Sequence, residues 1–209
     1  MIFLQYTTIK QSAQAEFVEK RSRFIGYALP VSEEEKATEF IEQIRRKHWD
    51  ATHNVYAYSI RDGGLCRYSD DGEPSGTAGM PTLSVLTKGG ITDAVVVVTR
   101  YFGGVLLGTG GLVRAYSHAA ALAVEAAGIV TMRTFAVMRI ECDYTAYGRV
   151  ASLIPECGGY ITDTAFTDRV EVEFRIVPET VGAFEKKLAD ATAGKALLTQ
   201  TGETIAPDE

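Results

Sequence analysis

Hydrophobic and polar positions along the chain follow patterns that predict a mixture of strands and helices. The segment His53–Ile60 alternates and is rich in aromatic residues, so it predicts a strand. The apolar run within Asp93–Arg100 predicts a central strand buried on both faces. Between residues 32 and 47 apolar side chains recur at helical spacing, with acids in the first turn and bases in the last. Ser32 is the expected N-cap of this helix.

The rest of the first half supplies two further strands and two further helices by the same criteria. The strands are expected at residues 16–20 and 23–29, a short helix runs through Leu86, and a long helix covers residues 111–127. Thr77 is the expected N-cap of the short helix. Two long polar and glycine-rich loops, 68–79 and 101–110, remain, and such loops inside a compact domain are typical of function.

The last third has a regular order of elements. The expected strands are 136–142, 160–166, 170–177 and 196–200, and the expected helices are 144–157 and 178–191. The order β-α-β-β-α-β is the ferredoxin-like split βαβ arrangement. We therefore expect an α+β protein of two domains, residues 1–135 and 136–209. The polar tail 202–209 is expected to be frayed.

Charge distribution supports two domains with different surfaces. Residues 1–135 carry 14 basic and 14 acidic side chains, whereas residues 136–209 carry 7 and 13, so the net charge of −6 lies in the last third. This balance argues against wrapping duplex DNA, which needs clustered cations. No apolar run of about 18 residues predicts a membrane span, and no secretory signal is evident. Three cysteines in no metal-binding pattern are typical of reduced thiols, and we expect a cytoplasmic protein.

The first candidate site is a glycine-rich segment that follows the buried strand and opens the long helix. Free N–H groups at such a helix start attract anions, and nearby arginines add charged hydrogen bonds. The candidate anion-binding residues are Arg100, Gly103, Gly104, Gly108, Thr109, Gly110, Gly111 and Arg114. The spacing matches neither a P-loop nor a dinucleotide-binding fingerprint. The alternative is that the glycines serve tight turns and close packing.

The second candidate site is the acidic loop, which we expect to line a groove together with the glycine-rich segment. Its residues are His53, Asp70, Asp71, Gly72, Glu73, Ser75, Gly76, Thr77 and Tyr101. The carboxylates could contact a ligand or partner, bind Mg²⁺ or Ca²⁺, or form a solvated turn. The pair Tyr101-Phe102 could stack on a base or pack over the strand end. No catalytic residue, bound metal or cofactor is expected.

Long stretches of the chain resemble the IMPACT family. They are Tyr-Ser-Asp-Asp-Gly-Glu-Pro-Ser-Gly-Thr-Ala-Gly at 68–79, Val-Thr-Arg-Tyr-Phe-Gly-Gly at 98–104 and Leu-Gly-Thr-Gly-Gly-Leu-Val-Arg-Ala-Tyr at 107–116. Met80 departs from the family pattern, where many members carry a basic residue. Residues 136–202 are similar to the extra C-terminal domain of the bacterial, YigZ-type branch.

The resemblance implies both fold and function. The N-terminal domain should resemble domain 2 of ribosomal protein S5, and the C-terminal domain the last domain of elongation factor G. Eukaryotic members regulate translation by competing for the activator of a starvation-sensing kinase, a pathway that bacteria lack. We expect a translation-associated regulatory or binding protein that contacts RNA, the ribosome or a protein partner through the groove. The alternative is an enzyme acting on a nucleotide or phosphorylated small molecule, although the Ser-rich helix start of small-molecule kinases with this fold is missing.

Overall fold

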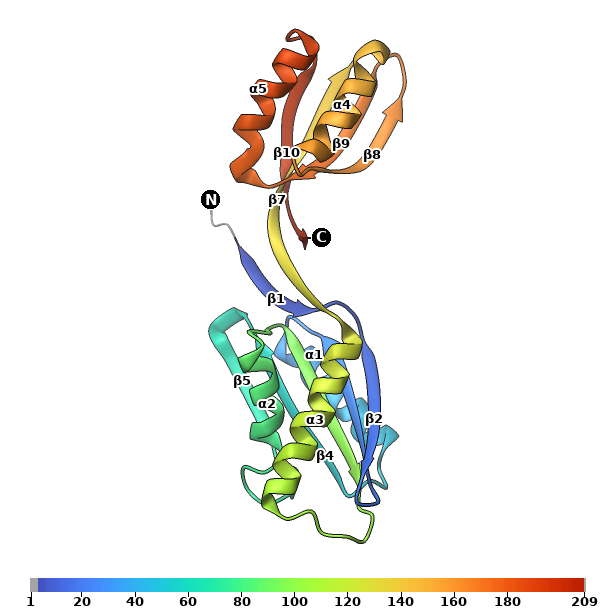
Figure 1. Cartoon of the computed structure of the whole chain (residues 1–209), viewed down its shortest axis with the longest axis vertical. Helices are drawn as coiled ribbons and strands as arrows, with labels where there is room; N and C mark the ends of the chain where they lie inside the picture. The colour runs from blue at the N-terminus through green and yellow to red at the C-terminus, as the bar shows by residue number, and fades with distance from the viewer. Residues whose placement is uncertain (1–3, 209) are drawn as a thin grey trace. The chain divides into compact units, whose positions relative to one another are not determined.

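The computed structural model describes residues 4–208, which form two α+β units (Figure 1). One unit is Tyr6–Thr131, and the other takes the remaining residues. Strands β1 (Gln5–Ile9) and β7 (Ile129–Cys142) contribute residues to both units. The boundary expected between residues 135 and 136 falls inside β7. The two-domain α+β class expected from the sequence is confirmed.

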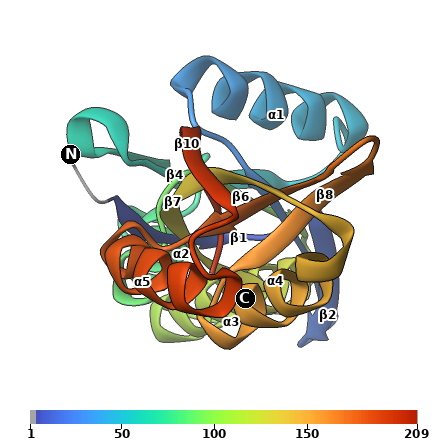
Figure 2. The same ribbon diagram turned by 90° about the horizontal axis from the view of Figure 1, so that it is seen from above.

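The Tyr6–Thr131 unit is an antiparallel sheet covered by helices on both faces. The strand order is β2 (Ala13–Glu19), β3 (Ser22–Pro30), β6 (Ala94–Tyr101), β4 (His53–Ile60) and β5 (Leu65–Ser69). Helix α1 (Glu34–Lys47) lies on one face, and α2 (Gly79–Lys88) and α3 (Thr109–Ala127) lie on the other, as Figure 2 shows from above. A 3-10 turn, Asp62–Gly64, joins β4 to β5.

The central strand β6 supplies the core on both faces of this sheet. Val95 and Val97 pack into the cluster with α1, whereas Val96 and Val98 pack into the cluster with α2 and α3. All four side chains are fully buried. Because successive strand residues point to opposite faces, a continuous apolar run is the pattern that a doubly covered strand requires. The expectation of a strand buried on both faces is confirmed.

Several local expectations for this unit were wrong. The N-cap of α1 is Glu33 rather than Ser32, and no side chain bonds to that helix end. Strands β1 and β5 were missed. Both contain only five residues, and three consecutive residues of β5 are exposed, so neither shows a usable hydrophobic period.

The second sheet has the order β8 (Tyr160–Phe166), β9 (Val170–Ile176) and β7, and both β1 and β10 (Leu197–Pro207) neighbour β7. The β8–β9, β9–β7 and β7–β10 pairs are antiparallel. Helices α4 (Tyr144–Glu156) and α5 (Val181–Thr192) pack on this sheet through one apolar cluster, and a 3-10 turn, Pro178–Thr180, precedes α5. This element order and strand order give the ferredoxin-like arrangement expected from the sequence.

The polar C-terminal segment is not frayed over its described part. Strand β10 continues through residues 202–207 and pairs with β7 as far as the partners Pro207 and Met132. Strand pairing uses backbone groups, so a polar segment can complete a sheet edge without an apolar pattern. None of the described helices is long and apolar enough to cross a membrane.

Candidate functional site

The two long loops meet at one end of the first sheet. His53 at the start of β4 lies opposite Arg100 near the end of β6. The backbone N–H of Thr52 donates to the carbonyl of Arg100 at 2.9 Å. The hydroxyl of Thr52 accepts from the N–H of Phe102 at 3.1 Å. These contacts hold the start of the glycine-rich segment beside β4.

A cavity of about 420 Å³ opens between these loops and the start of α3. The side chains and backbone that matter for its chemistry are His53, Glu73, Arg100, Phe102, Leu106 and Thr109. Glu73 and Arg100 are buried, whereas Phe102 and Leu106 are 45% and 82% exposed. The cavity therefore combines a buried polar wall with an exposed apolar rim.

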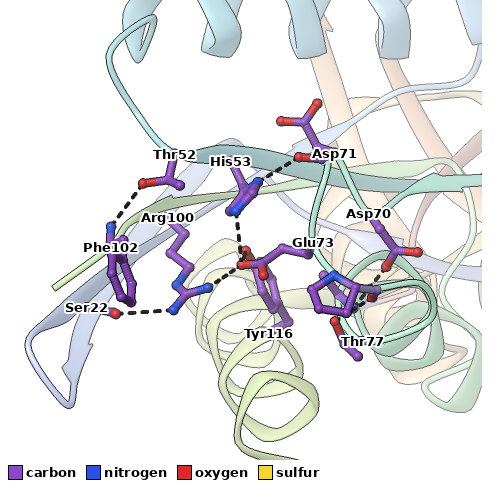
Figure 3. Close-up of polar contacts among 12 residues, drawn as sticks. Ser22, Thr52, His53, Asp70, Asp71, Glu73, Thr77, Arg100, Phe102 and Tyr116 are labelled. Atoms are coloured by element: carbon purple, nitrogen blue, oxygen red, sulfur yellow. Dashed lines mark hydrogen bonds and ion pairs between the residues drawn. The ribbon is translucent and has the colours of Figure 1, made fainter. Parts of the chain in front are cut away.

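Glu73 organises the polar wall (Figure 3). Its Oε1 atom accepts from Arg100 Nη1 at 2.5 Å and from the Tyr116 hydroxyl at 2.8 Å. Its carboxylate also lies 3.7 Å from Nε2 of His53. Burial raises the pKa of the Tyr116 hydroxyl, and the neighbouring Glu73 carboxylate raises it further. Tyr116 is therefore a fixed hydrogen-bond donor to Glu73.

Several neighbours in the fold contact Arg100, although its buried Nε atom has no hydrogen-bond partner among residues 4–208. Its Nη2 atom lies 3.4 Å from the hydroxyl oxygen of Ser22, and its guanidinium carbon lies 5.5 Å from the ring centre of Phe24 and 5.4 Å from that of Phe102. The ion pair with Glu73 offsets its charge. Arg100, a candidate anion-binding residue, therefore already has a carboxylate partner, because the acidic loop reaches it.

The acidic loop is held by hydrogen bonds in which its carboxylates accept from different partners. Asp71 Oδ2 accepts from the N–H of Asn54 at 2.6 Å, and its Oδ1 atom lies 3.3 Å from Arg45 Nη2. The backbone carbonyl of Asp71 accepts from Nδ1 of His53 at 2.7 Å. Because these groups diverge, the loop has no convergent set of oxygens. Among residues 4–208, no group of three His, Cys, Asp or Glu side chains could hold a metal ion.

Asp70 caps helix α2, a role expected of Thr77. Its Oδ1 atom accepts from the N–H groups of Ala78 and Gly79 at 3.0 and 2.7 Å, and Oδ2 accepts from Gly76 at 2.9 Å. Thr77 instead donates its hydroxyl to the carbonyl of Pro74. The Thr77 expectation was wrong because the capping oxygen comes from eight residues before Ala78, outside the local N-cap pattern.

The other loop residues have conformational or surface positions. Gly72 and Gly76 adopt positive φ angles of 85° and 76°, which favour glycine in a tight turn. Ser75 is exposed. Tyr101 lies outside the cavity: it packs with the α1 cluster, accepts from His48 Nδ1 and donates to Asp50. A base-stacking role at this cavity is therefore left to Phe102.

Helix α3 begins without a cap. Its N-cap is Gly108 with φ 72°, no side chain bonds to the helix end, and no acidic residue lies in the first turn. Leu112 is the first residue whose N–H bonds back, to the carbonyl of Gly108. Within the described chain, the N–H groups of Thr109, Gly110 and Gly111 donate to no other residue. Three N–H groups at the positive end of the helix dipole are thus available to a ligand.

The glycines of this segment divide between the two roles left open by the sequence. A Cβ on Gly103 would lie 2.0 Å from the backbone of Arg21, so this glycine serves close packing. Gly104 and Gly108 have positive φ angles, and a Cβ on Gly111 would lie 3.0 Å from Leu107. A Cβ on Gly110 would meet nothing closer than Arg114 Nη1 at 3.8 Å. Neither packing nor backbone conformation requires glycine at 110.

Arg114 lies beside the helix start but outside the cavity. It lines a second cavity of about 270 Å³ with Phe17, Lys20 and His118. Its guanidinium reaches back to the first turn, as its distance from a Cβ on Gly110 shows. Arg114 is exposed and forms no ion pair or hydrogen bond with other described residues. Arg100 and Arg114 therefore differ in their surroundings. The charge of Arg100 is neutralised by Glu73, whereas Arg114 has no acidic partner among the described residues.

Two known domain families match most of the chain. The Impact N-terminal domain model matches residues 20–124, which contain the whole cavity, and a domain of unknown function (DUF1949) matches residues 140–195. The IMPACT family member YvyE of Bacillus subtilis is 38% identical over 192 residues, covering 91% of this chain and 88% of that protein. The chain belongs to the IMPACT family.

Other IMPACT relatives cover the chain to different extents. The IMPACT family member YigZ of Escherichia coli is 34% identical over 86% of this chain and 89% of that protein. The Protein IMPACT homolog of Dictyostelium discoideum is 37% identical over 95 residues, which is 43% of this chain and 27% of that protein. A solved structure of a hypothetical protein is 31% identical over 94% of this chain and 97% of its own, with a TM-score of 0.59.

Sequence reasoning missed three members of the polar wall and its supports. Ser22 and Thr52 were missed because single hydroxyls next to strands carry no motif. Tyr116 lies within one of the stretches that resemble the IMPACT family, but its helical spacing indicates only a core residue. Its hydroxyl contact with Glu73 depends on pairing across 43 residues.

Proposed function

We propose that this IMPACT family member is a translation-associated regulatory protein whose Tyr6–Thr131 unit binds single-stranded RNA at the start of α3. The observation that carries the proposal is the uncapped helix end with three free N–H groups beside the cavity. Phosphate oxygens only accept hydrogen bonds, and a helix N-terminus offers donors together with a positive dipole. A link to translation is supported by the resemblance to eukaryotic members that regulate it.

Two neighbouring features favour RNA over a neutral ligand. The adjacent cavity carries two exposed cations, Arg114 and Lys20, against the one carboxylate of Glu19, and arginine pairs well with phosphate. Phe102 is an exposed aromatic ring on the cavity rim, where a base could stack. The exposed leucine at 106 extends the apolar rim.

The test exploits the absence of any structural need for Gly110. We expect Gly110→Ala to stabilise the protein by about 0.5–1 kcal/mol, because alanine suits a helix better than glycine, while weakening RNA binding about 10-fold by crowding the N–H groups. The matched control is Gly148→Ala in α4, where a Cβ also meets nothing. It should stabilise the protein without changing RNA affinity. Titration with a short single-stranded RNA and thermal unfolding measure both effects.

Arg114→Ala separates phosphate binding from other modes. Loss of one charge-assisted hydrogen bond should weaken RNA binding about 10-fold, and binding by the native protein should fall as salt rises. The same titrations with ATP examine the enzyme alternative. If the protein binds neither RNA nor ATP, the glycine-rich segment has a packing role and a protein partner is favoured. If it hydrolyses ATP, the enzyme alternative is favoured.

A further inference from the structure

The backbone partner of His53 determines that its Nδ1 atom carries a hydrogen. Nδ1 of His53 lies 2.7 Å from the carbonyl oxygen of Asp71. A carbonyl oxygen can only accept, so Nδ1 must carry the hydrogen. In the neutral imidazole, Nε2 is then an acceptor, and His53 lines the cavity.

Glu73 offers a second acceptor in the same cavity. Both hydrogen bonds to its carboxylate go to Oε1, from Arg100 and Tyr116. Oε2 accepts from no other residue in the described part of the chain, although the side chain is only 4% exposed. Because Oε2 is neither hydrogen-bonded within the described residues nor fully sealed, it keeps some exposure to solvent. A carboxylate oxygen to which the protein gives no donor has its hydrogen-bonding capacity free for a ligand group in the cavity.

The required donor is a neutral one. Arg100 already places a positive charge 2.5 Å from this carboxylate, so an ammonium or guanidinium ligand would be repelled by it. A hydroxyl group can donate to Oε2 or to Nε2 of His53 without adding charge.

The cavity therefore combines hydroxyl acceptors with phosphate donors. Gly108 and Thr109, at the uncapped start of α3, line the same cavity as Glu73 and His53. A ribose phosphate presents both matching groups, because its phosphate accepts and its 2′-hydroxyl donates. Deoxyribose lacks that hydroxyl, which is the group by which proteins distinguish RNA from DNA.

We propose that this cavity selects ribose over deoxyribose because the 2′-hydroxyl donates its one hydrogen to either Glu73 Oε2 or His53 Nε2. The inference rests on the proposed RNA binding at α3 and names the chemical feature that the site reads. Neither residue is needed for phosphate contact, so selectivity and affinity are separable.

The test compares an RNA oligonucleotide with the DNA of the same sequence. We expect the native protein to bind RNA at least about 10-fold more tightly than DNA, the effect of one hydrogen bond to a charged group. Glu73→Gln should bring this ratio close to 1, because its carbonyl can keep the bonds from Arg100 and Tyr116 while its NH₂ group replaces Oε2. His53→Ala, which leaves that buried ion pair intact, should also lower the ratio. Thermal unfolding checks that both variants fold.

Gly110→Ala is the control that separates the two proposals. It should weaken RNA and DNA binding equally and leave their ratio unchanged. Equal binding of RNA and DNA by the native protein would overturn the ribose inference while phosphate binding stands. Binding of neither oligonucleotide would remove the RNA function. AMP and dAMP are a second pair of probes: a preference for AMP without oligonucleotide binding would support ribose selection and contradict the RNA function.

Discussion

Helices α2 and α3 of the Tyr6–Thr131 unit lie on the same face of one sheet, but a side chain caps the start of α2 and none caps the start of α3. At α2, the Asp70 carboxylate accepts from three N–H groups, those of Gly76, Ala78 and Gly79. At α3, Gly108 provides no cap, and no acid lies in the first turn. Both starts follow long glycine-containing loops, and the sequence predicts that the two loops line one groove.

The difference shows which loop is structural and which is open to a ligand. Burial raises the pKa of Asp70, but the hydrogen bonds from Gly76, Gly79 and Ala78 lower it more, and the net pKa is below its ordinary value. The carboxylate of Asp70 is thus used within the fold. The α3 start keeps the same backbone donors and dipole free, with Arg114 beside it. The proposed RNA site therefore lies at the start of α3. The acidic loop contributes the buried polar wall of the adjoining cavity.

A carboxylate introduced at the uncapped start of α3 should make it resemble the start of α2, which Asp70 already caps. Gly110→Glu brings a carboxylate to the first turn of α3, where the dipole favours it but phosphate is repelled. We expect RNA affinity to fall about 100-fold, since like charges in contact cost several kcal/mol. Fluorescence titration measures this loss.

The matched control is Gly148→Glu, at an exposed position of α4 with no neighbour near a Cβ. It changes the net charge equally but brings no carboxylate to the first turn of α3, so it should alter RNA affinity by less than about 3-fold, the effect of a screened change in net charge. Undiminished RNA binding by Gly110→Glu would show that the α3 start is not the phosphate site.

Removing the cap of α2 should affect stability and leave binding alone. Asp70→Ala leaves three N–H groups without their acceptor, so the free energy of unfolding should fall by about 1 kcal/mol. Urea unfolding measures the loss, and Ser75→Ala, an exposed change in the same loop, is the control. A loss of RNA affinity in Asp70→Ala without loss of stability would assign Asp70 to the ligand instead.

The stability that Asp70 contributes should depend on pH. A carboxyl group whose pKa is lowered by folding stabilises the protein above its unfolded-state pKa, and this stabilisation disappears as the pH falls through the folded-state pKa. The difference in unfolding free energy between native protein and Asp70→Ala should therefore be full at neutral pH and shrink below about pH 4. A difference that grows on acidification would contradict the capping role.

The smallest effect is expected at Thr77, and it distinguishes the two candidate caps of α2. Thr77→Val keeps the shape of the side chain but removes the hydroxyl that bonds to Pro74. Amide hydrogen exchange at Gly79 should change by less than about 2-fold, whereas Asp70→Ala should accelerate it about 5-fold. Faster exchange in Thr77→Val than in Asp70→Ala would restore the local cap.

Local sequence patterns were sufficient for most of the helices and strands. Strand β6 and helices α1 and α3 followed from hydrophobic period, and the ferredoxin-like order of the second unit followed from the spacing of its elements. The glycine-rich segment and the acidic loop were both identified as belonging to one site, and Glu73, His53 and Arg100 do line one cavity.

The sequence by itself determined which side chains could be buried, which backbone positions could form turns and which groups could donate hydrogen bonds, since these properties are local. Only the tertiary structure decided their partners. Glu73 meets Arg100, Tyr116 and His53 from separate elements, and these contacts convert a predicted anion-binding arginine into a neutralised one. Asp70 rather than Thr77 caps α2, and the polar end of β10 is ordered by the backbone of β7. Hydrogen bonds and ion pairs act over a few ångströms in space, whatever the separation along the chain, so their partners depend on how strands and helices pack.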